Sequence, residues 1–241
     1  MFKIFLNNFK TTNDCIIVAT PLILFFTILG SYLAYAINVA DDTTERVFAA
    51  ITIFIMVSGF LSAWFYMIKK AIYLTKQVFL FDKERLNAIF GLFKEFLKGI
   101  GRLLIPIIWM LSTVIVAFVI FLGLLSFLIE RGIFNTGYDI VIYFSLIIST
   151  FTTMYWIPEI VYSKKNAFVS LFESINKLFN NLKESFILYI FISFLMSVIF
   201  IVNFLLPNHP IMSFLSLLLF YYLLVYVVVL LFDYYDNKFE R

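Results

Sequence analysis

Residues Lys69–Arg102 form the stretch KKAIYLTKQVFLFDKERLNAIFGLFKEFLKGIGR, which carries eight of the eighteen Lys and Arg residues in the chain. Long apolar runs flank it on both sides, yet the stretch itself is too charged to cross a bilayer. From Leu86 onward its apolar residues recur every three or four positions, as on one face of a helix. The pattern predicts a segment on the cytoplasmic membrane surface that joins two pairs of membrane-spanning helices.

The composition of the whole chain predicts a membrane protein. Of its 241 residues, 63% are apolar and 14% are charged, whereas a soluble domain averages about 45–50% apolar and about 25% charged residues. Lipid must cover much of this apolar surface, and long apolar runs without alternation favour helices over barrel strands. We expect a single all-α membrane domain over residues 1–241. Its expected partners are the lipid bilayer and other membrane subunits, and not nucleic acid.

Six apolar runs reach the roughly 20 residues that a helix needs to cross the bilayer. They occupy about 15–37, 47–68, 103–128, 140–160, 185–206 and 211–232. Within the first run, Ala34-Tyr35-Ala36 resembles a signal-peptide cleavage site. The run is longer than a usual signal-peptide core, so we expect it to be retained as a membrane span.

The distribution of cationic residues predicts the orientation. If the N-terminus is cytoplasmic, sixteen of the eighteen Lys and Arg residues lie inside, and only Arg46 and Arg131 lie outside. Lys and Arg near membrane spans resist translocation, so this asymmetry indicates which side is inside. We expect a multi-pass protein of the cell membrane with both termini in the cytoplasm.

Interfacial amphipathic helices are expected at about 1–13, 82–102 and 163–184, each followed by two spans. Residues 69–81 are expected to continue the second span past the membrane surface. The apolar faces of the second and third helices comprise Leu86, Ile89, Phe90, Phe93, Leu97, Ile100 and Leu104, and Phe168, Leu171, Phe172, Ile175, Leu178, Phe179, Leu182 and Phe186. The opposite face of the third includes Ser170, Glu173 and Lys177. The plan suggests a unit used three times, and the alternative is three unrelated amphipathic helices.

The sequence contains no recognisable catalytic, cofactor-binding or metal-binding set. Its only histidine, His209, stands in a Pro-Asn-His-Pro turn without a nearby acid. One histidine cannot supply a metal site or a catalytic triad, and no nucleophile elbow or glycine-rich phosphate loop is present. We expect no enzyme activity and no cofactor.

Glu159, which follows Pro158 near the inner end of the fourth span, is the best single functional candidate. An acid within a membrane span is costly and therefore suggests either an ion or substrate site or a specific partner. The alternative is a boundary carboxylate that pairs with a lysine or meets lipid headgroups. Pro158 is expected to kink this helix or to end it early. The candidate lipid-headgroup contacts are Lys94, Lys98, Arg102, Lys164, Lys165 and Lys177.

Two features predict contacts between helices. Gly59-x-x-x-Ala63 is a pair of small residues that permits close helix approach. Tyr222 and Tyr226 lie within the sixth span, where they are expected to line a polar path or to hydrogen-bond to another helix.

Two stretches of the chain resemble a known group of proteins. They are residues 158–195, PEIVYSKKNAFVSLFESINKLFNNLKESFILYIFISFL, and residues 229–241, VLLFDYYDNKFER. An acid at the end of a span, an amphipathic helix beginning AFVSLFES and a closing Tyr-Tyr-Asp are similar to those of six-span bacterial and archaeal membrane proteins. This group includes the membrane domain found beside glycerophosphodiester phosphodiesterases and related families of undefined function. The resemblance implies a fold and a membrane role, because the phosphodiesterase of that family is a separate soluble domain.

The sequence therefore suggests a non-enzymatic role in membrane organisation, or as a subunit of a membrane assembly, with inner-surface contact to anionic lipid. The alternative is a transport protein, for example an ABC-type permease subunit in which residues 69–102 act as a coupling element. Co-purification with an ATPase would discriminate between these two hypotheses.

Overall fold

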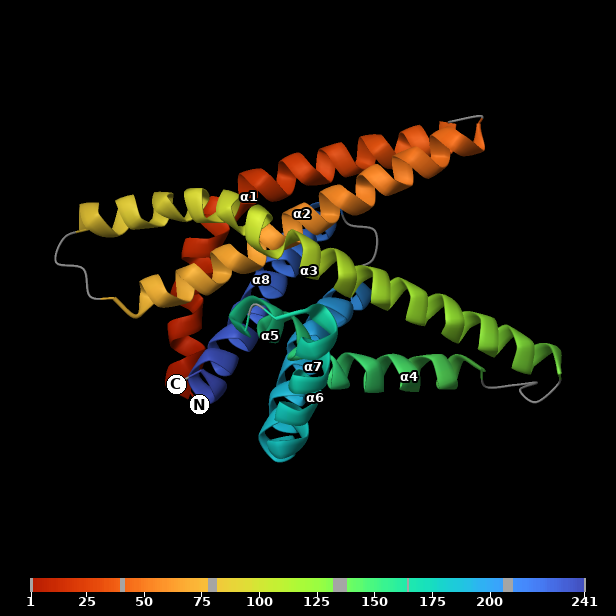
Figure 1. The fold of residues 1–241 in the computed structure, drawn as a ribbon. Coiled ribbons are helices and arrows are strands. Elements are labelled where there is room, and N and C mark those ends of the chain that lie inside the picture. Colours follow the sequence, from red (N-terminus) through yellow and green to blue (C-terminus); the bar gives the residue numbers. More distant parts are fainter. Residues whose placement is uncertain are drawn as a thin grey trace. The chain divides into compact units, whose positions relative to one another are not determined.

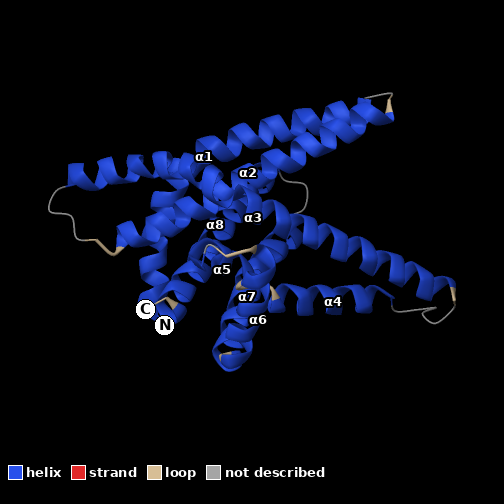
Figure 2. Cartoon of the chain, in the orientation of Figure 1, coloured by secondary structure: helices blue, strands red, loops and turns tan. Residues whose placement is uncertain are grey.

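Figure 1 shows the computed structural model of the chain. The structure describes residues 2–39, 42–77, 82–131, 138–163, 165–205 and 210–240. Within these ranges every regular element is an α-helix and no strand occurs, as Figure 2 shows. The prediction of an all-α protein is therefore confirmed.

Eight helices follow one another along the described ranges. They are α1 (Phe2–Val39), α2 (Thr43–Thr75), α3 (Asp82–Glu130), α4 (Tyr138–Thr152), α5 (Trp156–Ser163), α6 (Ala167–Asn180), α7 (Leu182–Leu205) and α8 (Pro210–Phe239). The predicted interfacial segments 1–13 and 82–102 run into their spans as the continuous helices α1 and α3, whereas the third predicted segment contains a separate helix, α6.

Four candidate membrane spans are found in the described part of the chain. By length and hydropathy these are α2, α3, the combined segment Ile140–Ser163, and Leu215–Phe239 of α8. A fifth is present if α6 and the first part of α7, joined at a 101° bend, count together as one broken span. These are the helices of a multi-pass membrane protein, and the number of six spans stays a prediction.

The helices form two compact units. The first unit comprises Met1–Leu104 and Ile190–Arg241, and the second comprises Ile105–Tyr189. In the first unit α1 packs along α2 and α8, and in the second α5 packs against α6. The single membrane domain expected from the sequence stays a prediction.

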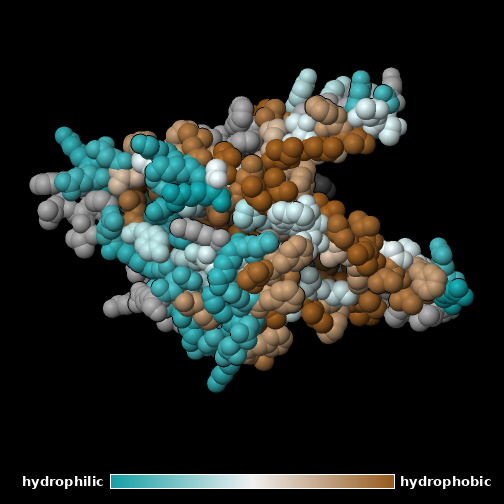
Figure 3. All heavy atoms as spheres, in the orientation of Figure 1, coloured by the Kyte–Doolittle hydropathy of each residue, from teal (hydrophilic) through white to brown (hydrophobic). Residues whose placement is uncertain are grey.

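Large apolar side chains are exposed on the parts of these helices that the sequence assigns to membrane spans. The surfaces of the second half of α3 and of α4 are mostly hydrophobic, as Figure 3 shows. The exposed side chains there include Val116, Val119, Ile120, Leu124, Tyr143 and Phe144. Extended apolar surface of this kind is unfavourable in water and is typical of helices that face lipid.

The fourth predicted span is broken, as the proline in it suggests. Helix α4 ends at Thr152 and α5 begins at Trp156, with residues 153–155 in a turn between them. Pro158 is the third residue of α5, where its missing N–H costs no helical hydrogen bond. In an unbroken helix the proline ring would clash with the carbonyl four residues earlier, at Met154. The break therefore lies one turn before the proline, at the carbonyl that its ring would meet.

Helix α3 crosses α2 at Gly99, within the first unit. A Cβ atom at Gly99 would lie 2.8 Å from the Cα of Ala63, from the carbonyl oxygen of Ser62 and from the Cβ of Tyr66. Ala63 thus contributes to a close crossing, but a Cβ atom at Gly59, its partner in the predicted small-residue pair, would have nothing within 4 Å. The close approach depends on a glycine from a different helix.

Candidate functional site

Glu159, the candidate acid from the sequence, lies in the first turn of α5 and is buried. Its side chain is 1% exposed, and its Oε2 lies 2.6 Å from the Nζ of Lys177 on α6, whose side chain is 27% exposed. Of the two lysines that directly follow α5, Lys164 lies outside the described residues, and Lys165 contacts a different acid. The buried carboxylate is therefore paired with a lysine eighteen residues further along the chain.

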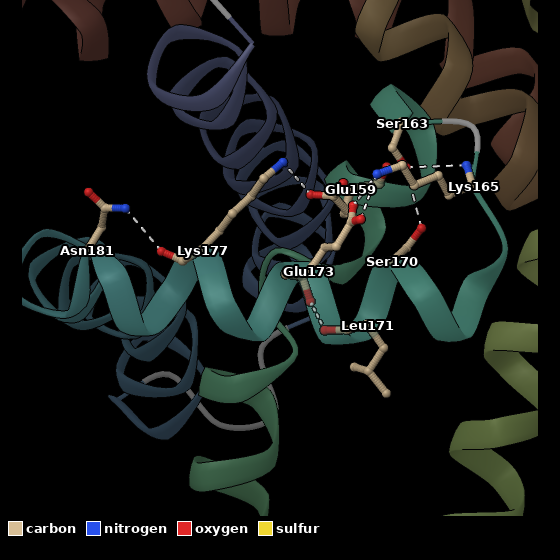
Figure 4. A network of polar contacts seen from close by, with 9 residues as sticks. Glu159, Ser163, Lys165, Ser170, Leu171, Glu173, Lys177 and Asn181 are labelled. Carbon is tan, nitrogen blue, oxygen red and sulfur yellow. Dashed lines mark hydrogen bonds and ion pairs between the residues drawn. The ribbon is translucent and has the colours of Figure 1, made fainter.

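A second ion pair completes this network, which Figure 4 shows. The Nζ of Lys165 lies 2.6 and 2.8 Å from the two carboxylate oxygens of Glu173 on α6. Glu173 also forms a side-chain hydrogen bond with Glu159. The hydrogen bond from Lys165 holds the pKa of Glu173 below its usual range.

The packing of α6 on α5 explains how these four side chains meet. The buried face of α6 consists of Ala167, Ser170, Ser174 and Leu178. Most of these residues are small, which permits close approach of the two helices. The indole Nε1 of Trp156 donates to the carbonyl oxygen of Ala167 at 2.8 Å and fixes the first turn of α6 against the first turn of α5.

This packing corrects one position in the faces that the sequence suggested for the segment 163–184. Ser170 was expected on the polar face and is buried, whereas Phe168, Phe172 and Phe179 of the predicted apolar face are exposed. Because lipid is as apolar as phenylalanine, a helix in a membrane protein gains little by hiding phenylalanine and more by pairing small and polar residues inside the protein.

Asn181 forms the corner between α6 and α7. Its backbone N–H donates to the carbonyl of Leu178 and its side-chain Nδ2 donates to the carbonyl of Lys177 at 3.1 Å, so both cap the end of α6. Its own carbonyl accepts from the N–H of Ser185 in the first turn of α7. One residue thus ends one helix and begins the next, at a bend of 101°.

The first unit contains a second polar network that the sequence did not single out. Lys76, just after α2, lies 2.6 Å from Asp236 and 3.5 Å from Asp233, both on α8. Tyr73 donates to Asp236 at 3.3 Å. The two aspartates belong to the Asp-Tyr-Tyr-Asp stretch that carries part of the family resemblance. In this structure the stretch fixes α8 to the end of α2.

The first helix also turns polar residues inward at this end of the unit. Asp14 is buried and its Oδ1 lies 2.9 Å from a guanidinium nitrogen of Arg85 on α3. Thr11 donates to the hydroxyl of Thr75 on α2 at 2.8 Å. Tyr222 of α8 donates to the side chain of Asn13 at 3.1 Å, so this mid-span tyrosine does bond to another helix.

Sequence reasoning missed this second network because its members are far apart in the chain. A usable signal was present, since Asp14 directly precedes the first predicted span, Asp233 directly follows the sixth, and both meet the same side of the membrane as Lys76 and Arg85 under the predicted topology. Opposite charges at span ends on one side of a membrane are natural partners.

The first half of α3, from Asp82 to Leu104, has three distinct sides. One side is buried and consists of Ile89, Leu92, Phe96, Gly99 and Leu103. The second is apolar but exposed and consists of Leu86, Phe90, Phe93 and Leu97. The third is polar and exposed, with Asn87, Gly91, Lys94 and Lys98. The apolar face predicted from the sequence corresponds mainly to the second, exposed side, and of the buried side it included only Ile89.

The candidate headgroup contacts on α3 differ in how they are engaged. Lys94 is exposed. Lys98 forms an ion pair of 2.6 Å with Glu95, one turn earlier on the same helix. Arg102 donates to the hydroxyl of Tyr66 at 2.6 Å and lies over its ring at 5.4 Å from the centroid. Lys94 and Lys98 are therefore the cations of this side that lipid can reach most readily.

Neither network supplies a set of metal-binding side chains. Among the residues that the structure describes, no group of three or more His, Cys, Asp or Glu side chains could hold a metal ion. His209 lies outside those residues. Comparison of the chain with family models, with curated proteins and with solved structures found no match. What the two networks can do is hold helices together at defined positions.

Proposed function

We propose that this chain is a non-enzymatic integral membrane protein that organises the inner leaflet, alone or as a subunit of a membrane assembly, by binding anionic lipid at its cytoplasmic side. The architecture that the sequence predicts is similar to that of the six-span group it resembles. The inner surface is where sixteen of the eighteen Lys and Arg residues lie under the predicted topology.

One observation carries the proposal, namely the three-sided first half of α3. Its buried side packs on α2, its exposed apolar side of Leu86, Phe90, Phe93 and Leu97 adjoins this, and its cations follow on the third side. A helix that lies where protein, lipid and water meet needs one side that packs on protein, one apolar side for lipid and one polar side for water. Anionic headgroups are found at that line, where each Lys or Arg contributes about 1 kcal/mol of attraction.

The lipid that the purified protein retains tests this function. Full-length protein is exchanged from mixed phosphatidylcholine and phosphatidylglycerol bilayers into mild detergent, and bound lipid is identified by native mass spectrometry. The double variant Lys94→Gln with Lys98→Gln removes two attractions of about 1 kcal/mol each, so its preference for phosphatidylglycerol should fall by about tenfold or more. The control is Arg46→Gln with Arg131→Gln, on the predicted outer side, which should keep the preference.

An unchanged preference in the Lys94 and Lys98 variant would contradict the proposal. Retention of an ATPase in the same purification would instead favour the transport hypothesis, with residues 69–102 as its coupling element.

A further inference from the structure

We propose that Tyr66 and Lys70 of α2 and Arg102 of α3 form a binding site for one phosphate group, and that the phosphate of a single anionic lipid occupies it. This inference rests on the proposed function, because it assumes anionic lipid at the inner surface. It goes beyond that function by naming a defined site for one lipid, separate from the exposed lysines Lys94 and Lys98.

The close crossing of α2 and α3 brings the three side chains of this site together. Gly99 lets the backbone of α3 approach Tyr66, whose Cβ would lie 2.8 Å from a Cβ added at Gly99. Arg102 follows Gly99 by one helical turn, and Lys70 follows Tyr66 by one turn, so each cation shares a helix face with a residue of the crossing. The two cations therefore approach the tyrosine from different helices.

Both cations lie against the ring of Tyr66. The Cζ of Arg102 is 5.4 Å and the Nζ of Lys70 is 5.8 Å from the centroid of this ring. The Nη1 of Arg102 also donates to the Tyr66 hydroxyl at 2.6 Å, and Tyr66 is only 5% exposed. A buried tyrosine thus holds the guanidinium in place. A group that is already positioned loses less conformational entropy when it binds a ligand.

The site offers hydrogen-bond donors and lacks an acceptor for them. Guanidinium and ammonium groups only donate, and the Tyr66 oxygen already accepts from Arg102, so its own hydrogen is left to donate. In the described part of the chain no carboxylate pairs with Lys70 or Arg102, and Glu95, one helical turn before Gly99, pairs with Lys98. Two like charges beside one ring repel each other, so an anion bound between them is favourable.

The chemistry of the donors fits a phosphate. The planar guanidinium of Arg102 matches a pair of phosphate oxygens, and the flexible stem of Lys70 can bring its ammonium group to the same anion. The hydroxyl of Tyr66 supplies a further donor. A phosphate diester, as in a lipid headgroup, presents the oxygens that these three groups require.

The position of the site along the chain favours a lipid as the source of the phosphate. Tyr66 lies at the end of the predicted span 47–68, Lys70 lies just beyond it, and Arg102 directly precedes the predicted span 103–128. Under the predicted topology both span ends lie at the inner membrane surface, which is the level of the lipid headgroups. The bilayer therefore presents phosphates to this site at high local concentration.

The last lipid to leave the protein tests the site. Full-length protein is taken from mixed phosphatidylcholine and phosphatidylglycerol bilayers into mild detergent, and native mass spectrometry at rising collision energy counts the phosphatidylglycerol molecules that stay bound. We expect one molecule to remain at energies that remove the other lipids. In the double variant Lys70→Gln with Arg102→Gln, the fraction of protein that keeps this molecule should fall by about tenfold or more, because two attractions to one phosphate are lost.

Matched variants separate the site from general effects of charge. Tyr66→Phe keeps the ring and removes only the hydroxyl, so the fraction should fall several-fold. Arg102→Lys keeps the charge and loses the planar fork, so its fraction should lie between those of the parent and the double variant. Lys83→Gln, which removes an exposed lysine on the same predicted side, should keep the lipid. If the double variant does not fold, the conservative variants Tyr66→Phe and Arg102→Lys decide the question.

Inorganic phosphate distinguishes the two sources of the phosphate group. Added at millimolar concentration to the lipid-bound protein, it should leave the last phosphatidylglycerol in place. Displacement of the lipid would assign the site to free phosphate and would overturn the lipid as its occupant.

Undiminished retention of the last lipid by the folded double variant would overturn the site. The proposed function is judged by a different readout, the overall preference for phosphatidylglycerol that depends on Lys94 and Lys98. Loss of that preference in the Lys94 and Lys98 variant, together with a last lipid that is insensitive to Lys70 and Arg102, would leave the proposed function standing and remove the site alone.

Discussion

Gly99 shows how a single atom sets the distance between two helices. Its missing Cβ leaves room for the backbone of α2 at Ser62 and Ala63, which a side chain would meet at 2.8 Å. Backbone atoms in a packed helix cannot give way cheaply, unlike the end of a flexible side chain. The sequence marked Ala63 as part of a small-residue pair, but it could not identify Gly99, because spacing within one helix says nothing about which other helix crosses it.

Substitution of Gly99 by alanine should therefore destabilise the protein, although alanine favours helix formation. Overpacking a well-filled contact costs about 1–3 kcal/mol, which exceeds the gain of about 1 kcal/mol in helix propensity, so the apparent Tm of the detergent-solubilised protein should fall by several degrees. Gly101→Ala on the same helix is the control. Nothing lies within 4 Å of its added Cβ, so its Tm should stay equal or rise. Equal behaviour of the two variants would contradict the close crossing.

At the scale of the elements, the structure adds to amphipathic patterns the side of each helix that packs on protein. Periodicity predicted helices at 82–102 and 163–184, and both segments are helical over most of their length. The same periodicity could not assign the faces, since Leu92 and Leu97 are equally apolar, yet Leu92 packs on protein and Leu97 is exposed. Ser170 is buried for the complementary reason, because a small hydroxyl residue permits close packing and its polarity is tolerated inside the protein. Where lipid replaces water, hydrophobicity no longer indicates which side faces the core.

Lys76 connects α2 to α8 through ion pairs, and its replacement gives a prediction at the scale of the elements. Its partners Asp233 and Asp236 have side chains that are only 10% and 8% exposed, while Lys76 itself is 35% exposed. Removing one partner of a buried ion pair costs about 3–5 kcal/mol, and partial exposure of the lysine reduces this to roughly 1–3 kcal/mol. Lys76→Met should therefore lower the apparent Tm by several degrees.

The matched control for Lys76→Met is Lys83→Met, which removes an exposed lysine from the start of α3. Its Tm should change little, because an exposed charge contributes little to stability. Equal Tm values for Lys76→Met and Lys83→Met would disprove that Lys76 stabilises the contact between α2 and α8. Replacing Asp236 by Asn in the Lys76→Met background should recover part of the loss, since the uncompensated buried charge is then removed.

For the whole molecule, composition was sufficient to predict an all-α membrane protein, and four candidate spans are present in the described residues. A membrane span is recognised from the length and hydropathy of one continuous stretch, so it can be predicted without knowing which helices it contacts. The pairing of Asp14 with Arg85, or of Glu159 with Lys177, depends on how helices meet, and charge counts alone do not specify it. The candidate site was thus located from sequence at Glu159, but its partner and its burial required the structure.

The orientation in the membrane is the last prediction, and it concerns the molecule as a whole. Sixteen of eighteen Lys and Arg residues lie on the side assigned to the cytoplasm, and cationic residues resist translocation. Single cysteines at Thr44, in the first turn of α2, and at Lys94, on α3, are both exposed and lie on opposite predicted sides. In intact cells a membrane-impermeant thiol reagent should label Thr44→Cys and should leave Lys94→Cys unlabelled until the membrane is permeabilised. Because Cys15 is fully buried, the parent protein serves as the unlabelled control. The opposite pattern would place the basic surface of α3 outside, where it could not meet the anionic lipid of the inner leaflet, and it would remove the basis of the proposed function.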